Sequence, residues 1–126
     1  MRSKLFTTGL VLALGAGCAF NALAQVKPEV LVDQRIAAMR LQGKYLFPLV
    51  PMAQSKVPYD AAMVARNAGY LDVLIRLAWD GFDPSTQSVK SRSLPEIYAE
   101  PAKFKAAQET MFAETNKFVA AARSGN

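Results

Sequence analysis

Apolar residues recur at alternating intervals of four and three in three segments, and this spacing constrains the fold more than any other feature of the sequence. It places side chains on one side of an α-helix. We predict helices at about 28–47, 58–79 and 101–123, each opening near a proline, whose missing N–H costs little in a first turn. One side of the first helix carries Val32, Ile36, Met39, Gly43, Leu46 and Val50. The residues expected to face inward are Val64, Ala68, Leu71, Ile75 and Ala78 in the second helix, and Phe104, Ala107, Met111, Phe118 and Ala121 or Ala122 in the third.

Glycine and proline mark where these helices should stop. Pro48 and Pro51 are expected to end the first helix, and Gly125 is expected to take the left-handed cap of the third. The connection 80–100 contains glycine, prolines and several serines, and it should be irregular. No alternating strand pattern occurs in the sequence, so the predicted class is all-α with an up-and-down bundle.

The first 24 residues have the features of a secretory signal peptide. Arg2 and Lys4 precede an uncharged apolar run at 5–20, and Ala22-Leu23-Ala24 supplies a small-x-small cleavage site. We therefore predict export to the periplasm, cleavage after Ala24 and one domain at 25–126. A lipoprotein with Cys18 as its N-terminus is the weaker alternative, because Gly15 stands where the lipoprotein motif normally has a larger aliphatic residue.

Composition excludes several classes of function. Beyond the leader the chain has no histidine and no cysteine, so the usual general base, thiol chemistry and disulfides are missing, and we expect no enzyme. The leader holds two basic and no acidic residues, so 13 basic against 10 acidic residues give the remainder a net charge of +3. These charges are scattered, which argues against nucleic-acid binding. No apolar stretch of the mature chain is long enough to cross a membrane.

Five ordered pieces of the sequence resemble cytochrome c′ and its low-spin relatives, the class II c-type cytochromes. The pieces are 32–39 (VDQRIAAM), 57–62 (VPYDAA), 77–82 (LAWDGF) with 84–86 (PST), 94–98 (LPEIY) with Phe104, and 120–126 (AAARSGN). The resemblance implies three helices of a four-helix bundle, haem c as cofactor, and either one-electron transfer with redox partner proteins or binding of a small gas at haem iron. It also implies a possible homodimer through the first two helices.

One feature of that family is absent from residues 1–126. The fourth helix of the family carries Cys-x-x-Cys-His, whose thiols attach the haem and whose imidazole ligates iron. Because residues 1–126 lack this motif, haem cannot attach covalently within them. Three explanations stay open: a fragment, a truncated gene, or a motif on another polypeptide.

The resemblance also implies site residues. Met39 matches the position facing the open side of the iron, where a thioether can act as the sixth ligand, although core methionine is common filler. Arg35 matches an arginine that approaches a haem propionate, and Thr86 and Gln87 match a loop pair at the haem edge. For these three residues a solvated surface role is the alternative. Gly43 either leaves room for a macrocycle or marks a close helix crossing.

Two other functions are compatible with the sequence. A haem-free interaction module would dimerise or dock on a partner through an exposed apolar stripe. A noncovalent haem carrier would rely on Met39 alone, a poor anchor without imidazole.

Overall fold

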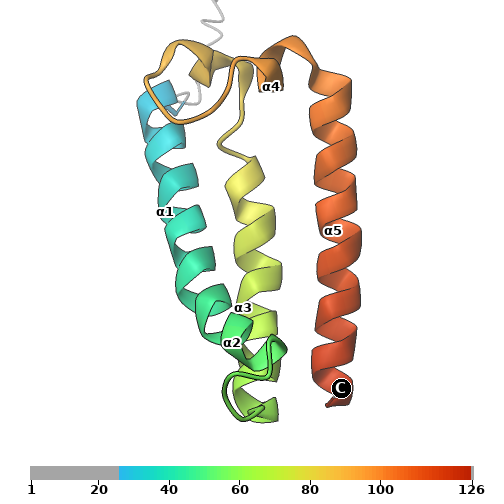
Figure 1. Ribbon diagram of the computed structural model, residues 1–126. Helices are drawn as coiled ribbons and strands as arrows, with labels where there is room; N and C mark the ends of the chain where they lie inside the picture. The colour runs from blue at the N-terminus through green and yellow to red at the C-terminus, as the bar shows by residue number, and fades with distance from the viewer. Residues whose placement is uncertain (1–25, 126) are drawn as a thin grey trace, which may run out of the picture.

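The computed structural model describes residues 26–125, which form three long helices arranged up and down (Figure 1). These are α1 (Pro28–Leu46), α3 (Ala61–Trp79) and α5 (Pro101–Ser124), and α3 lies between the other two in the view of Figure 1. A 3-10 turn, η1 (Phe47–Leu49), and α2 (Val50–Ala53) follow α1 directly. The described residues contain no strand, so the predicted all-α class is confirmed. The predicted signal peptide lies outside the described residues.

The long connection between α3 and α5 contains two short helical elements, η2 (Pro84–Ser88) and α4 (Glu96–Ala99). It crosses the end of the bundle where α1 begins (Figure 1). The connection touches both outer helices, because η2 packs on α1 and α4 packs on α5. No helix among the residues described has the length and apolarity needed to cross a membrane.

Two helix boundaries differ from the sequence prediction. The chain stays helical beyond Pro48 and Pro51, because each proline occupies an early position of a new short turn, where no intrahelical N–H bond is needed. α3 begins at Ala61 rather than near Pro58, since the Asp60 carboxylate accepts a hydrogen bond of 2.9 Å from the Met63 amide and caps the helix. α5 ends as predicted, with Gly125 in the left-handed conformation at φ 78°.

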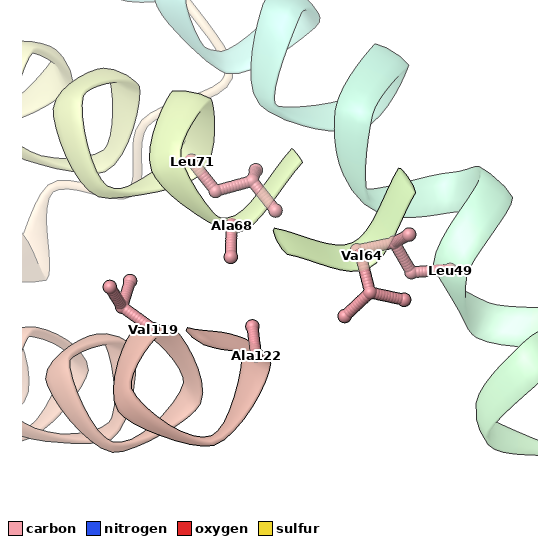
Figure 2. Packing of buried hydrophobic residues seen from close by; sticks show 6 residues of the cluster. All are labelled: Leu49, Val64, Ala68, Leu71, Val119 and Ala122. Carbon is pink, nitrogen blue, oxygen red and sulfur yellow. The ribbon is translucent and has the colours of Figure 1, made fainter. Parts of the chain in front are cut away.

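The core lies between α3 and its two neighbours. Its buried residues, shown in Figure 2, are Leu49, Val64, Ala68, Leu71, Val119 and Ala122. The predicted inward face of α3 is confirmed, because four of its five residues are buried and Ile75 is partly buried. α3 thus holds the bundle together by packing on α1 and on α5.

Most of the apolar stripe predicted for α1 lies outside the core that the helices form with one another. Only Val32 of the six residues is buried, whereas Met39, Leu46 and Val50 are exposed. α1 contacts α3 through a face that includes polar groups: the Gln42 amide donates to the Leu74 carbonyl at 2.9 Å, and the Asn67 amide donates to the Tyr45 carbonyl at 3.0 Å. The apolar stripe is therefore free to face a different space.

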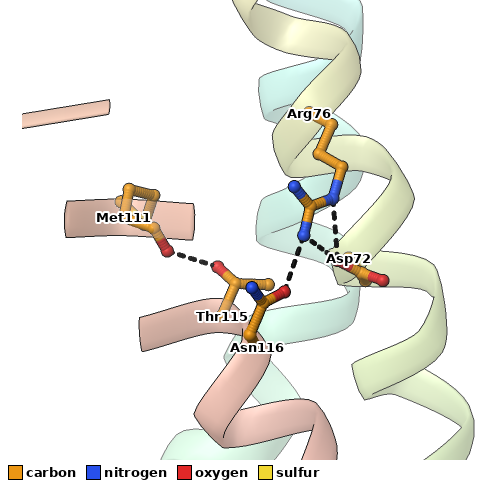
Figure 3. A network of polar contacts seen from close by, with 5 residues as sticks. All are labelled: Asp72, Arg76, Met111, Thr115 and Asn116. Atoms are coloured by element: carbon orange, nitrogen blue, oxygen red, sulfur yellow. Dashed lines mark hydrogen bonds and ion pairs between the residues drawn. The ribbon is translucent and has the colours of Figure 1, made fainter. Parts of the chain in front are cut away.

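The prediction for α5 was partly right. Ala122 is buried and Phe118 packs on the core, but Met111 is exposed. Thr115 is also buried, although a polar residue was not expected in the core. Its hydroxyl donates to the Met111 carbonyl at 2.7 Å within the helix, and this bond satisfies the polar group in the interior (Figure 3). Beside it, Arg76 of α3 donates to Asn116 of α5 at 2.7 Å and pairs with Asp72 at 2.9 Å (Figure 3).

Candidate functional site

A cavity of about 820 Å³ opens between α1, the long connection and the start of α5. Ligand pockets in proteins usually measure about 300–1,000 Å³. The cavity is lined by Arg35, Ile36, Met39, Arg40, Gly43, Phe47, Phe82, Ser91, Arg92, Ser93, Ile97 and Phe104. Most of these walls are apolar, and every charged residue among them is an arginine. The cavity therefore suits a large apolar ligand that carries negative charge.

α1 forms one wall with the apolar stripe that does not pack on α3. Ile36, Met39 and Gly43 follow one another at helical intervals along this wall. Met39 keeps 44% of its surface exposed, so its thioether is not enclosed by core neighbours. The space beside Met39 is open, as a cofactor-facing methionine requires.

Gly43 brings an aromatic ring close to the same wall. A Cβ added at Gly43 would lie 3.1 Å from the Phe47 ring, so the missing side chain lets that ring approach the helix. The three atoms nearest to that added Cβ all belong to the Phe47 ring, and Gly43 itself lines the cavity. The neighbour observed at Gly43 is therefore an aromatic ring of the cavity wall.

Aromatic rings that pack at tilted or edge-on angles contribute another wall of the cavity. The Phe82 and Phe104 centroids lie 5.0 Å apart, and Trp79 lies 5.6 Å from Phe82 and 4.9 Å from Phe104. Aromatic pairs at these distances hold their geometry well. Phe82 has two roles in this wall, because it packs on Trp79 and also lines the cavity.

Arg35 ties α1 to the connection. Its side chain is 2% exposed, and its guanidinium donates to the Gly81 carbonyl at 2.6 Å and to the Ser91 hydroxyl at 3.2 Å. The guanidinium also lies over the Phe82 ring, 4.3 Å from its centroid. Arg35 therefore lines the cavity with a buried side chain, which the Gly81 carbonyl and the Ser91 hydroxyl hold in place. Its predicted contact with a propionate stays a prediction.

Thr86 and Gln87 do not line the cavity. Thr86 is buried, and its hydroxyl bonds to the Asp83 carbonyl at 2.6 Å and to the Tyr98 hydroxyl at 2.8 Å. Gln87 is exposed. The structure brings Met39 and Arg35 together in one cavity. Thr86 and Gln87 lie outside that cavity, in the η2 turn. The predicted contact of Thr86 and Gln87 with a haem edge stays a prediction.

The η2 turn is fixed by Asp83. Its carboxylate accepts a hydrogen bond of 2.9 Å from the Ser85 amide. Hydrogen bonds from the Ser85 side chain and amide favour the charged carboxylate, so the pKa of Asp83 lies below its usual value. This turn carries Thr86, whose hydroxyl bonds to the Tyr98 hydroxyl of α4.

Arg40 and Arg92 are among the cavity residues that were not identified from the sequence. Arg40 follows Met39 directly, and its helical position could have indicated that it borders the same face. Arg92 belongs to the connection, whose path no periodicity reveals.

The described residues offer no metal site formed by protein side chains alone. No group of three or more Asp, Glu, Cys or His residues lies together in the part of the chain that the structure describes.

Comparisons with known proteins point to one family. A family model described as Cytochrome C′ matches residues 30–126. Cytochrome c′ of Alcaligenes xylosoxydans xylosoxydans is 34% identical over 100 residues, which cover 79% of this chain and 77% of that protein. The crystal structure of cytochrome c′ from Rubrivivax gelatinosus superposes with a TM-score of 0.76 at 29% identity, covering 80% of each chain. A nitric oxide complex of a variant cytochrome c′ from Alcaligenes xylosoxidans gives 0.73 at 33% identity, covering 80% of this chain and 79% of that one. The comparisons do not support the haem-free interaction module.

Proposed function

Because this chain belongs to the cytochrome c′ family, we propose that its cavity is the distal side of a haem site and that the protein transfers single electrons or binds a small gas such as nitric oxide. The haem supplies the redox-active iron at which either process takes place. The part described here contributes the walls that surround the macrocycle. In this role the protein binds a ligand and transfers electrons rather than catalysing a reaction.

The cavity beside Met39 supports this proposal more than any other observation. Its walls combine an aliphatic helix face with the Phe82 and Phe104 rings, and its volume of about 820 Å³ admits a large flat group. Apolar surroundings stabilise such a group by removing its surface from water. They also raise the reduction potential of the iron by disfavouring the more highly charged oxidised state.

Met39 is the residue we assign to the open side of the iron. A thioether is a soft ligand for iron, and a methionine axial ligand raises the potential of c-type haem. A thioether that does not bond the iron would instead limit the access of gases. Both roles need the exposed position that Met39 occupies in the cavity wall.

A haem assay on the protein isolated from its native periplasm tests the proposed function. We expect a reduced pyridine haemochrome spectrum typical of haem c and a spectral change on addition of nitric oxide. A product without haem would overturn the proposal.

Met39→Leu tests the assignment of that residue within the haem protein. We expect the substitution to change the absorption spectrum, the reduction potential or the affinity for nitric oxide, because the thioether leaves the cavity wall. Met111→Leu is the matched control, since Met111 is similarly exposed but does not line the cavity. If the two variants behave alike, Met39 does not face the iron.

The cellular setting is part of the same proposal. We propose that the protein is exported to the periplasm, where redox partner proteins reach it. We also propose that Gln25 is the mature N-terminus. Leu41 and Leu77 are exposed apolar residues that border a second, smaller cavity between α1 and α3. They support a homodimer formed through these two long helices. Mass spectrometry of the periplasmic protein and its sedimentation test these two points.

A further inference from the structure

We propose that Arg40 and Arg92 anchor the carboxylates of the macrocycle, so that the cavity selects a porphyrin with free acid groups. This inference rests on the proposed haem site and names the residues that orient the ligand within it. The two arginines line the cavity and make no hydrogen bond or ion pair with the rest of the described chain.

Arg40 and Arg92 stand out among the cavity residues because no hydrogen bond or ion pair holds them within the part of the chain described. Both side chains belong to exposed residues. Other arginines have partners: Arg76 pairs with Asp72, and Arg66 donates to Asn67. Two guanidinium groups without a partner, on the rim of one apolar cavity, are available to a ligand.

The charge around the cavity favours an acidic ligand. Its lining includes three arginines and no aspartate or glutamate. A guanidinium can bind a carboxylate through two parallel hydrogen bonds, which fixes its orientation as well as its position. A flat apolar ligand with carboxylates at its edge therefore matches both the walls and the rim.

Arg35 acts in this arrangement as a positioning residue. Its guanidinium is already bonded to the Gly81 carbonyl and the Ser91 hydroxyl and lies over Phe82. The Ser91 hydroxyl in turn accepts a hydrogen bond of 3.2 Å from the Ser93 amide. These two bonds hold the residues on either side of Arg92, so buried Arg35 fixes the loop that presents it.

Porphyrin binding to the protein purified without attached haem tests this inference, with protoporphyrin IX and its dimethyl ester as probes and their fluorescence as the readout. Neither probe contains iron, so Met39 ligation does not enter the comparison. We expect the unmodified protein to bind the diacid more tightly than the ester, and the preference to shrink at high salt. Arg40→Gln and Arg92→Gln should each weaken diacid binding by about fivefold and leave ester binding unchanged. Arg123→Gln, which removes an exposed arginine far from the cavity, is the matched control.

The outcomes separate this inference from the proposed function. If both probes bind but the diacid has no advantage, or if the arginine substitutions weaken both probes equally, the anchoring role is wrong and the cavity assignment stands. If neither probe binds and the native product also lacks haem, the proposed function fails, and the anchoring role fails with it. A loss confined to the diacid supports the inference.

Discussion

The Arg35 guanidinium donates a hydrogen bond of 2.6 Å to the Gly81 carbonyl and so joins α1 to the residue just beyond the end of α3. Gly81 also lies close to the stem of the Arg35 side chain, because a Cβ added at Gly81 would lie 2.5 Å from the Arg35 Cβ. This junction sets the path of the connection that closes the cavity. The bond and the close approach can be tested separately.

Arg35→Leu should destabilise the protein by about 3 kcal/mol. Leucine keeps most of the apolar stem but leaves the Gly81 carbonyl and the Ser91 hydroxyl without their charged donor. Urea unfolding followed by circular dichroism measures the change. Arg40→Leu, which removes an exposed arginine without a partner, should shift stability by no more than about 0.5 kcal/mol. Equal effects of the two substitutions would contradict a structural role for Arg35.

Gly81→Ala should cost about 1–3 kcal/mol, because the new methyl would lie 2.7 Å from the Leu31 carbonyl oxygen as well as against Arg35. Gly69→Ala provides the opposite case. Gly69 lies within α3, and nothing lies within 4 Å of its added Cβ, so alanine should stabilise the helix by about 0.5–1 kcal/mol. Thermal unfolding of both variants checks the sign of each effect. A stabilised Gly81→Ala protein would rule out the tight junction.

Leu71→Ala should destabilise the protein by about 2–5 kcal/mol, because Leu71 is 2% exposed and lies in the core that α3 forms with its neighbours (Figure 2). Leu77→Ala on the same helix should cost far less, since Leu77 is 54% exposed. Denaturant midpoints of the two variants give the comparison. Similar costs would mean that α3 does not pack as described.

The hydroxyls of Thr86 and Tyr98 should be energetically coupled, because they lie 2.8 Å apart and link η2 to α4. Thr86→Val and Tyr98→Phe together form a double-mutant cycle, for which we expect a coupling of about 1 kcal/mol. Unfolding free energies of the four proteins provide the measurement. Strictly additive effects would show that the two hydroxyls do not interact in solution.

The Asp83 carboxylate should make the η2 turn sensitive to acid. Since hydrogen bonds from Ser85 lower its pKa in the folded protein, its stabilising effect is complete above the usual carboxyl pKa of 3.8 and is lost as pH falls through the lowered value. An NMR titration of the Asp83 carboxyl and the Ser85 amide measures this directly. Asp83→Asn should remove the pH dependence of the Ser85 signal. A titration at or above the usual pKa would contradict the capping bond.

The sequence by itself determined the helices and most of the inward face of α3. Residues such as Leu71 and Ala78 follow a helical period, and that period is a local property of the chain. The left-handed cap at Gly125 was equally readable, because glycine adopts positive φ without steric cost. Five ordered pieces of sequence also sufficed to indicate the family.

Only the tertiary structure decided which apolar residues are covered. Met39 and Leu71 both fit a helical stripe, yet Met39 borders the cavity and Leu71 is buried, because burial depends on what another segment places opposite each face. The positions of Arg35 and Arg92 depend in the same way on the path of the connection, which bonds and ring contacts across more than 40 residues establish. Contacts between residues so distant along the chain leave no periodic trace in the sequence.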